Sequence, residues 1–354
     1  MSNRSQLRVS LNRFLPMLDA ALASDWQRVS AILHAPDTEE NELLRFLSTH
    51  DLLQPFYWMI QRDQASSSIP AWLLMQLIAA IQSGQERHLM LVSALREIVE
   101  QMALHQTSLV LLKGFHFSQA LYGNLNARRV RDLDLLVSPA DQSRISELLL
   151  ELGYRDKRIL PPHLHRRLVH ATSWQRAGLE LDLHHTLRVR PGYKISIDGL
   201  VSRAVNININ ELQIKVLAEA DCLLLLLLSL SGDVERGVVR LKSLVDIWAY
   251  LSLHEADTDW RGFFNDRESE GVRGLTMAAL RLFMVCLPCV SARFSRLGAF
   301  LDNDHGTLKQ GCSADLLSAT SSARRHWYVT HSSANSLIYM GWWVSSAPLR
   351  WLSS

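Results

Sequence analysis

The stretch "SLVLLKGFHFSQALYGNLNARRVRDLDLLVSP", residues 108–139, contains two short apolar runs separated by a turn and a helical pattern. The second run carries Asp132 and Asp134 among leucines and a valine. Residues two apart in a strand point to the same face, so the two carboxylates are expected side by side, with Leu133 and Leu135 on the opposite face. Burying carboxylates is costly unless a cation or hydrogen-bond donors offset the lost solvation. The sequence therefore predicts a positively charged partner for this pair.

Two kinds of partner fit the aspartate pair. Neighbouring carboxylates raise each other's pKa unless a cation lies between them. Mg²⁺ is such a cation, and it prefers carboxylate, phosphate and water oxygens. The alternative is a structural pair neutralised by arginine, because Arg128, Arg129 and Arg131 lie close by in the sequence.

The residues before the pair favour the metal. Lys113 and Gly114 lie where the first apolar run gives way to a helical pattern. Glycine allows a close approach of the backbone, and the free N–H groups of a helix start favour phosphate. Lys113 adds a point charge for the phosphates of a nucleotide.

A third carboxylate follows in "LELDLHHTL", where Glu180 and Asp182 alternate with leucines. The two acids are expected on one face of a strand. If this strand lies beside the one that carries Asp132 and Asp134, Asp182 completes a cluster of three carboxylates. Such a cluster can hold two metal ions, which position a triphosphate and lower the pKa of an attacking hydroxyl.

The surrounding chain divides into three regions by pattern. Residues 1–106 read as helices, and residues 196–354 are again mostly helical. Between them, residues 107–195 alternate short apolar strands with helical patterns. The expected fold is α+β, a small mixed-sheet core flanked by N-terminal and C-terminal helical regions. Strands are expected over 108–114, 130–138 and 179–189, and helices over 115–123 and 139–153. The stretch "NININELQIKVL", residues 206–217, fits either a strand or an irregular connection.

The composition sets few limits on function. The formal net charge of +2 gives no strong attraction to nucleic acid or to membranes. Cys286 and Cys289 form a single C-x-x-C without a second ligand pair, so both are expected to be buried thiols and not zinc ligands. With four cysteines in all and no recognisable export signal, the expected compartment is the cytoplasm.

Two apolar segments raise the question of membranes and partners. The run from Cys222, "CLLLLLLSLSG", is too short to cross a bilayer and predicts a buried helix. The Trp-rich segment 336–354 is either a contact site for a partner or membrane surface, or a segment docked on the core.

Five histidines between residues 163 and 185 suggest a zinc hydrolase as a competing interpretation. Zinc needs about four ligands in a tetrahedral array, and His163 with His165 supplies only part of one. His184 is expected on the same strand face as Asp182, where it either orients substrate, bonds that carboxylate, or makes a structural hydrogen bond.

Taken together, "LLKGFHFSQALYGN", "RRVRDLDLLV", "ELGY" and "LELDLHHTL" resemble the uncharacterised nucleotidyltransferase family of the DNA polymerase β-like superfamily. The resemblance covers about residues 111–187. A later segment, "RLKSLVDIWAYL" with Arg240 and Asp246, is similar to a helical element of that family. Lys113 and Gly114 stand where the superfamily usually has Gly-Ser, and Asp182 stands where this family more often has Glu.

The resemblance implies an activity and a set of roles. Asp132, Asp134 and Asp182 would be the catalytic carboxylates and the ligands of Mg²⁺ or Mn²⁺. Nucleotide binding would fall to three further residues, Lys113, Gly114 and Arg128. The enzyme would move an NMP group from an NTP, with ATP the expected donor, to a hydroxyl of an unidentified acceptor and release pyrophosphate. That acceptor is a small molecule, a peptide, a protein or an RNA end.

Two other functions remain open. One is a non-catalytic module on the same fold that binds a nucleotide or a partner protein. The other is a phosphotransferase that moves only the γ-phosphoryl group, which would release NDP in place of pyrophosphate. The three carboxylates argue against the binding module, because a scaffold has no need of them.

Overall fold

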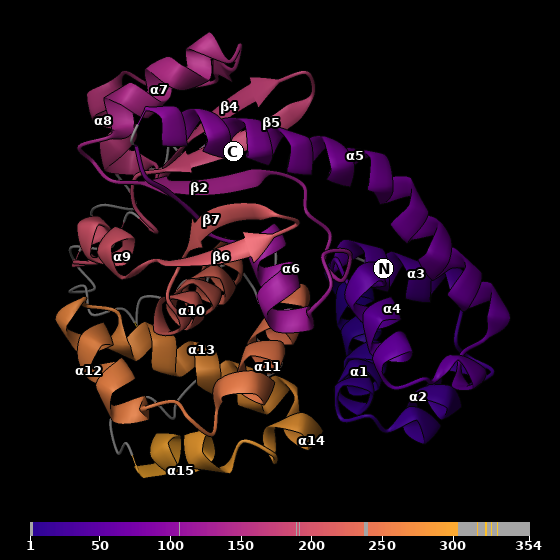
Figure 1. Ribbon diagram of the computed structural model, residues 1–354. Helices are drawn as coiled ribbons and strands as arrows, with labels where there is room; N and C mark the ends of the chain where they lie inside the picture. The colour runs from indigo at the N-terminus through magenta and orange to yellow at the C-terminus, as the bar shows by residue number, and fades with distance from the viewer. Residues whose placement is uncertain are drawn as a thin grey trace.

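A computed structural model describes residues 3–105, 107–188, 190, 192–236 and 240–303, and the single residues 317, 323, 327 and 331. It has the expected α+β architecture, in which helices flank a mixed sheet (Figure 1). The Trp-rich segment 336–354 lies outside the described residues. No helix in the described part of the chain combines the length and the apolar character needed to cross a bilayer.

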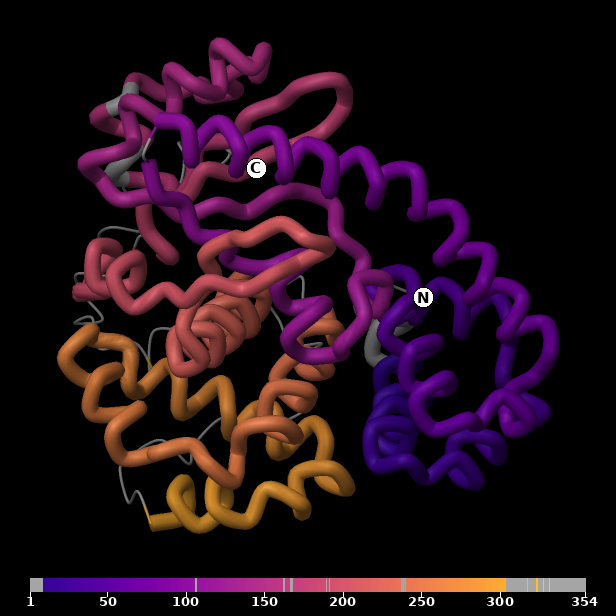
Figure 2. Tube along the Cα trace, in the orientation of Figure 1, coloured from indigo at the N-terminus to yellow at the C-terminus, as the bar shows by residue number. Residues whose placement is uncertain are grey.

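The N-terminal part of the chain is helical, as its pattern predicts. Its elements are α1 (Asn3–Leu22), α2 (Trp26–Leu33), α3 (Glu40–Thr49), α4 (Leu53–Arg62), the short 3-10 helix η1 (Ser66–Ser68) and α5 (Ala71–Leu104). The long helix α5 leaves the other N-terminal helices and runs across the sheet (Figure 2). Residues 82–87, at its middle, are exposed.

The sheet has seven strands: β1 (Leu109–Leu111), β2 (Leu133–Val137), β3 (Arg155–Asp156), β4 (Ala171–Arg176), β5 (Leu179–His184), β6 (Val205–Ile209) and β7 (Leu212–Val216). Their order is β3-β4-β5-β2-β1-β7-β6. The pairs β2–β5 and β1–β7 are parallel, and the other neighbours are antiparallel. The strands with the candidate carboxylates, β2 and β5, are therefore direct neighbours at the centre.

The two faces of the sheet are buried by different helices. On one face, Leu133 and Leu135 share a core with the second half of α5 and with α7 (Gln142–Glu151). On the other face, Leu112 and Leu136 belong to a larger core. That core includes α6 (Phe115–Tyr122), α10 (Glu219–Arg236), α11 (Lys242–His254) and residues of α1–α4. The candidate carboxylates alternate with Leu133 and Leu135, so they face the second side.

Five further helices contribute residues to this core: α9 (Ile197–Arg203), α12 (Trp260–Ser269), α13 (Arg273–Cys286), α14 (Pro288–Ser291) and α15 (Ser295–Asn303). The remaining helix, α8 (Pro162–Leu168), lies between β3 and β4 in the chain. The leucine run that begins at Cys222 lies in α10 and is buried, as expected. Burial on all sides explains why its residues are apolar all round.

The structure decides the stretch that the sequence leaves open and moves the bounds of other elements. Residues 206–216 lie in the hairpin β6–β7, so this stretch is strand, and its turn residues Asn210 and Glu211 both have positive φ. Because β7 pairs with β1, the sheet extends past residue 195. The helix expected from Pro139 begins at Gln142, and β2 begins at Leu133 and not at residue 130.

Strand β5 ends before its expected limit at residue 189. After His184 the backbone N–H groups of His185 and Thr186 both turn to the carbonyl oxygen of His170. The ladder is interrupted there, so the chain leaves the sheet directly after the candidate site.

Candidate active site

The parallel pairing of β2 and β5 brings two of the candidate carboxylates together. Asp134 and Asp182 are Cα partners in the ladder. One ligand atom each from Asp134, Asp182 and His184 lie within 4.8 Å of one another. Asp182 therefore lies beside Asp134, as expected from neighbouring strands, and His184 joins them, while Asp132 is not one of these three residues.

Asp134 is the buried centre of this cluster, with 2% of its surface exposed. Its Oδ1 accepts from the Lys113 Nζ at 3.0 Å and lies 2.9 Å from the His184 Nε2. Burial alone would raise the pKa of this carboxyl, but the Lys113 ammonium and the His184 hydrogen bond lower it below its usual value. Asp134 is therefore held as a carboxylate. Its partners are a lysine and a histidine, and not the arginines of the structural alternative.

Asp132 lies one residue before β2 and is half-buried. No hydrogen bond or ion pair joins its carboxylate to another described residue. Burial and the charge of Asp134 both raise its pKa, while Lys113 opposes the shift. A cation bound nearby would stabilise the ionised form of this half-buried carboxylate, because it would offset the repulsion from Asp134.

Asp182 is half-buried and better exposed than Asp134. The Ser173 hydroxyl on β4 donates to its Oδ1 at 2.6 Å, which fixes the side chain from the neighbouring strand. The sequence analysis did not consider Ser173. Its register position opposite Asp182 becomes evident only once β4 and β5 are paired.

The donor set suits a divalent cation. Asp134 and Asp182 supply two carboxylates, and Asp132 is a third close by. Carboxylate oxygens are ligands that Mg²⁺ and Mn²⁺ prefer, and Mn²⁺ also accepts an imidazole such as that of His184. His184 also serves such a site from outside, because its bond to the Asp134 Oδ1 orients that ligand. The buried cluster can therefore hold a divalent metal ion.

The Lys113-Gly114 turn lies between β1 and α6, as the sequence predicts. Gly114 has φ +68, and a Cβ there would lie 3.2 Å from the Val130 Cγ1. A side chain is therefore excluded by both backbone conformation and space. The pKa of Lys113 is raised, because Asp134 and Asp132 outweigh the effect of its burial. The turn thus places a permanent cation and a helix N-terminus beside the acidic cluster.

A cavity of about 170 Å³ opens from this cluster toward α10 and α11. Its lining includes Lys113 and His184 from the sheet side and two carboxylates, Asp233 and Asp246. Six cationic side chains line it: Lys113, Arg128, Arg188, Arg236, Arg240 and Lys242. Cations outnumber carboxylates, so the cavity favours an anionic ligand.

Most of these cations are paired closely within the protein, but two are not. The Arg240 Nε and the Lys242 Nζ lie 3.6 Å and 3.9 Å from the Oδ2 of the buried Asp51. Burial and the nearby Arg128 lower the pKa of Lys242 to about 8. A cation held this loosely in a buried setting is available to an incoming anion. The sequence analysis named Arg240 only through the resemblance and missed Lys242.

Arg128, a candidate for nucleotide binding, lines the cavity between the Lys113-Gly114 turn and α11 and is 6% exposed. Its guanidinium donates to the Asp246 Oδ2 at 2.8 Å and to the Gly114 carbonyl oxygen at 3.5 Å. The Tyr122 hydroxyl donates to the other oxygen of Asp246 at 2.7 Å. Arg128 thus joins the Lys113-Gly114 turn to α11, which gives Asp246 a structural part in the site.

The other arginines and histidines have separate partners. Arg131 pairs with Asp51, while Arg129 is exposed. The His165 Nε2 lies 2.8 Å from the Ala171 carbonyl oxygen, and His163 is exposed. Among the described residues, the candidate metal cluster includes His184 but neither of these two histidines. His184 bonds Asp134 and not Asp182.

The C-x-x-C cysteines divide between core and surface. Cys286 is buried in α13 as expected, but Cys289 is exposed, which corrects the expectation of two buried thiols. Cys289 lies in α14, where helix geometry turns it away from the core that holds Val290.

Searches of curated proteins and of solved structures gave no match to this chain. Residues 36–288 match the family described as "Uncharacterised nucleotidyltransferase". The match covers well over half of the 354 residues and includes β1, α6, β2, β5 and α11, which carry the acidic cluster and the cationic cavity. The chain belongs to this uncharacterised nucleotidyltransferase family.

Proposed function

We propose that the protein is a divalent-metal-dependent nucleotidyltransferase that moves an NMP group from an NTP to an acceptor hydroxyl. The observation that carries the proposal is the juxtaposition of the Asp134–Asp182–His184 cluster with a cationic cavity. An acidic cluster suits metal ions, and the cations beside it suit the phosphates that those ions accompany. ATP is the first donor to test, with Mg²⁺ or Mn²⁺ as the metal.

In the proposed reaction, the acceptor oxygen attacks the α-phosphorus of the NTP. A new oxygen–phosphorus bond forms, the bond to the β-phosphate oxygen breaks, and pyrophosphate leaves with the electron pair. Bound divalent ions would supply charge neutralisation for the triphosphate and lower the pKa of the attacking hydroxyl. The protein contributes position and charge, which carry most of the rate in phosphoryl chemistry.

Each residue has a distinct part in this proposal. Asp132, Asp134 and Asp182 hold the metal ions, with His184 orienting Asp134. Asp182, which is more exposed than Asp134, also serves the acceptor and takes up its proton. Lys113 binds the triphosphate from the sheet side and Lys242 from α11. Arg128 acts through Gly114 and Asp246 and is a positioning residue.

Cell extract incubated with the protein, a divalent metal and each NTP in turn tests this proposal. Mass spectrometry should find a species heavier by one NMP, with one pyrophosphate released per product. The Asp134→Asn variant should form no product, and Glu180→Gln, on the exposed part of the same sheet face, should behave as the wild type. Release of NDP would indicate γ-phosphoryl transfer, and NTP binding without any product would indicate the binding module.

We propose the cytoplasm as the compartment, because a chain with four cysteines suits a reducing environment. A partner contact through the Trp-rich segment 336–354 is a further part of the proposal. Deleting that segment should leave pyrophosphate release unchanged and remove only the partner.

A further inference from the structure

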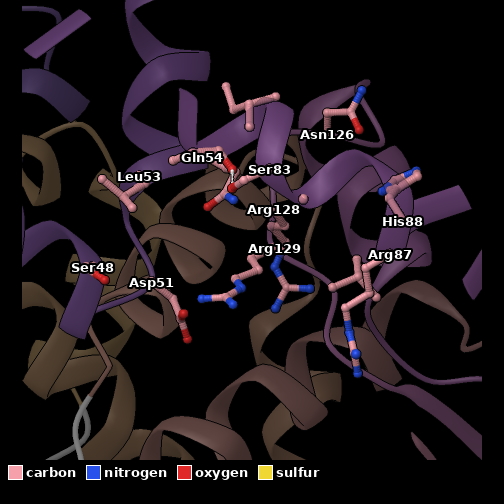
Figure 3. Close-up of a pocket in the computed structure, with 14 residues that line it drawn as sticks. Ser48, Asp51, Leu53, Gln54, Ser83, Arg87, His88, Asn126, Arg128 and Arg129 are labelled. Atoms are coloured by element: carbon pink, nitrogen blue, oxygen red, sulfur yellow. Dashed lines mark hydrogen bonds between the residues drawn. The ribbon is translucent and has the colours of Figure 1, made fainter. Parts of the chain in front are cut away.

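A second cavity, of about 210 Å³, lies between the N-terminal helices and the chain that leads into β2. Ser48 on α3, Gln54 on α4 and Asp51 between these helices line it, together with Arg87 and His88 on α5. Asn126 and residues 128–130 close it. Figure 3 shows the guanidinium groups of Arg128 and Arg129 directed into the space between Asp51 and Arg87. None of the sequence motifs pointed to this cavity.

The cavity is positively charged, because its one carboxylate is already neutralised. Asp51 pairs with Arg131 and lies near Arg240 and Lys242. In contrast, the guanidinium of Arg129 is exposed and has no hydrogen bond or ion pair with the described residues. An arginine without a counter-charge, at the edge of a cavity, is a ready site for a carboxylate or a phosphate.

The walls of the cavity are held in place by backbone contacts. Arg87 donates through Nη2 to the Arg131 carbonyl oxygen at 2.7 Å and through Nη1 to the Gly178 carbonyl oxygen at 3.3 Å. Arg128 is anchored on Asp246, as described above. Arg87 and Arg128 are thus positioned before a ligand arrives, so less of their conformational entropy is lost on binding.

The cavity is also next to the reacting centre. Its lining chain, residues 128–130, continues through Arg131 directly into Asp132. Val130 lies against Gly114, the turn glycine of the phosphate side. Arg128 lines this cavity and the first one, so the two spaces meet at its side chain.

We infer that this second cavity binds the acceptor, and that the acceptor is a small molecule with an anionic group, read by Arg129, next to the hydroxyl that is modified. The inference rests on the proposed nucleotidyl transfer, which fills the first cavity with the triphosphate. A cavity of about 210 Å³ has room for a compact anionic group.

Two substitutions test the site without touching the proposed catalytic groups. Arg129→Ala removes the unpartnered charge. Gly84→Leu narrows the cavity by adding a side chain to its wall. The substitution should be tolerated, because a Cβ at Gly84 meets nothing within 4 Å and leucine favours the helix more than glycine does. Arg144→Ala is the matched control, an exposed arginine on α7 across the sheet.

Calorimetry with inorganic phosphate as the probe measures the site through the difference between each variant and the wild type, because the first cavity is the same in all of them. Arg129→Ala should weaken phosphate binding by about tenfold, the loss expected for one charge-assisted bond. Gly84→Leu should weaken it by taking up space in the cavity, while Arg144→Ala leaves it unchanged. Binding of ATP with Mg²⁺ should be retained in all three. Unchanged phosphate affinity in both cavity variants overturns the inference, and so does a parallel loss of ATP affinity, because the cavity would then belong to the nucleotide.

The second arm identifies the class of acceptor. Small molecules of a cell extract are separated on an anion-exchange resin, and each fraction is incubated with the protein and labelled ATP. Labelled product should form from the fraction that the resin retains, and its amount should be about tenfold lower with the Arg129→Ala variant. Product from the unretained fraction alone contradicts the inference. If ATP binds to no variant and not to the wild type, nucleotidyl transfer fails, and the phosphate measurement still decides whether the cavity is an anion site.

Discussion

Asp134 and Asp182 occupy the same level of two neighbouring parallel strands, and their carboxylates form one cluster with His184. The two residues differ in what surrounds them. Asp134 is buried and bonded to Lys113 and His184, whereas Asp182 is half-buried and bonded to Ser173. Because the environments differ, substitutions of the two residues are expected to impair different steps: metal-dependent NTP binding for Asp134 and turnover for Asp182.

Asp182→Asn should spare most of the NTP affinity and lower turnover by orders of magnitude. In the proposed reaction its carboxylate serves the acceptor, so its loss would affect an interaction made chiefly in the transition state. Calorimetry with ATP and an assay of pyrophosphate release, performed on the same preparation, separate the two effects. Turnover that survives the substitution contradicts the three-carboxylate site.

Asp134→Asn should abolish metal-dependent NTP binding while the fold remains intact. An amide keeps the size of the side chain but removes the charge that a divalent ion needs. Titration with Mn²⁺ by electron paramagnetic resonance checks the metal, and circular dichroism checks the fold. If the wild-type protein binds neither Mg²⁺ nor Mn²⁺ at millimolar concentration, the assignment of these carboxylates as metal ligands is wrong.

Lys113→Ala should weaken ATP affinity by roughly 1–3 kcal/mol, the value typical of one lost charge-assisted hydrogen bond. The position of Lys113 at the start of α6 puts its charge beside the free N–H groups of the helix. Calorimetry measures the change, with Lys157→Ala on the exposed face as control. Equal affinities in wild type and Lys113→Ala would exclude Lys113 as a phosphate ligand.

The ATP affinity should be constant below about pH 8 and fall above it. The pKa of Lys242 is lowered to about 8, so this lysine is charged below that pH and becomes neutral as the pH rises through it. A neutral amine no longer attracts phosphate. Lys242→Met should bind ATP more weakly and without this fall. Lys113→Ala should keep the fall, because the raised pKa of Lys113 leaves it charged. An identical pH profile for wild type and Lys242→Met refutes the role.

Asp246→Ala should lower the free energy of unfolding by about 3–5 kcal/mol, the cost of leaving a buried partner charge uncompensated. The substitution strands the Arg128 guanidinium, which is 6% exposed, and the buried Tyr122 hydroxyl. Denaturant unfolding measures the loss. The control is Lys157→Ala, which breaks an exposed pair with Glu180 and should change stability by less than about 1 kcal/mol.

The sequence predicted those parts of the site that are local in the chain. Alternation placed Asp134 opposite the apolar face of β2, and the turn at Gly114 followed from glycine chemistry. The hairpin β6–β7 stayed ambiguous because its turn, Asn210-Glu211, lacks the glycine that marks most two-residue hairpins. Its partner strand β1 lies about a hundred residues earlier, at a distance where local patterns carry no information.

The contacts that hold the site together are long-range, and the sequence analysis missed them for that reason. Ser173 meets Asp182 only through the register of β4 and β5. Lys242 and Asp51 approach one another although they are 191 residues apart in the chain (242 − 51). No periodicity or spacing connects such residues, although the charged positions in an otherwise apolar α11 were a signal that Lys242 and Asp246 have polar partners.

The carboxylate of Asp51 is shared by three cations, from the chain before Asp132 and from the start of α11. A single anion that serves three positions restricts how relatives of this protein can diverge. A change at residue 51 to a neutral side chain would leave Arg131, Arg240 and Lys242 repelling one another. Aligned relatives should therefore show coordinated substitution at these four positions, with the acid and the bases lost or kept as a set.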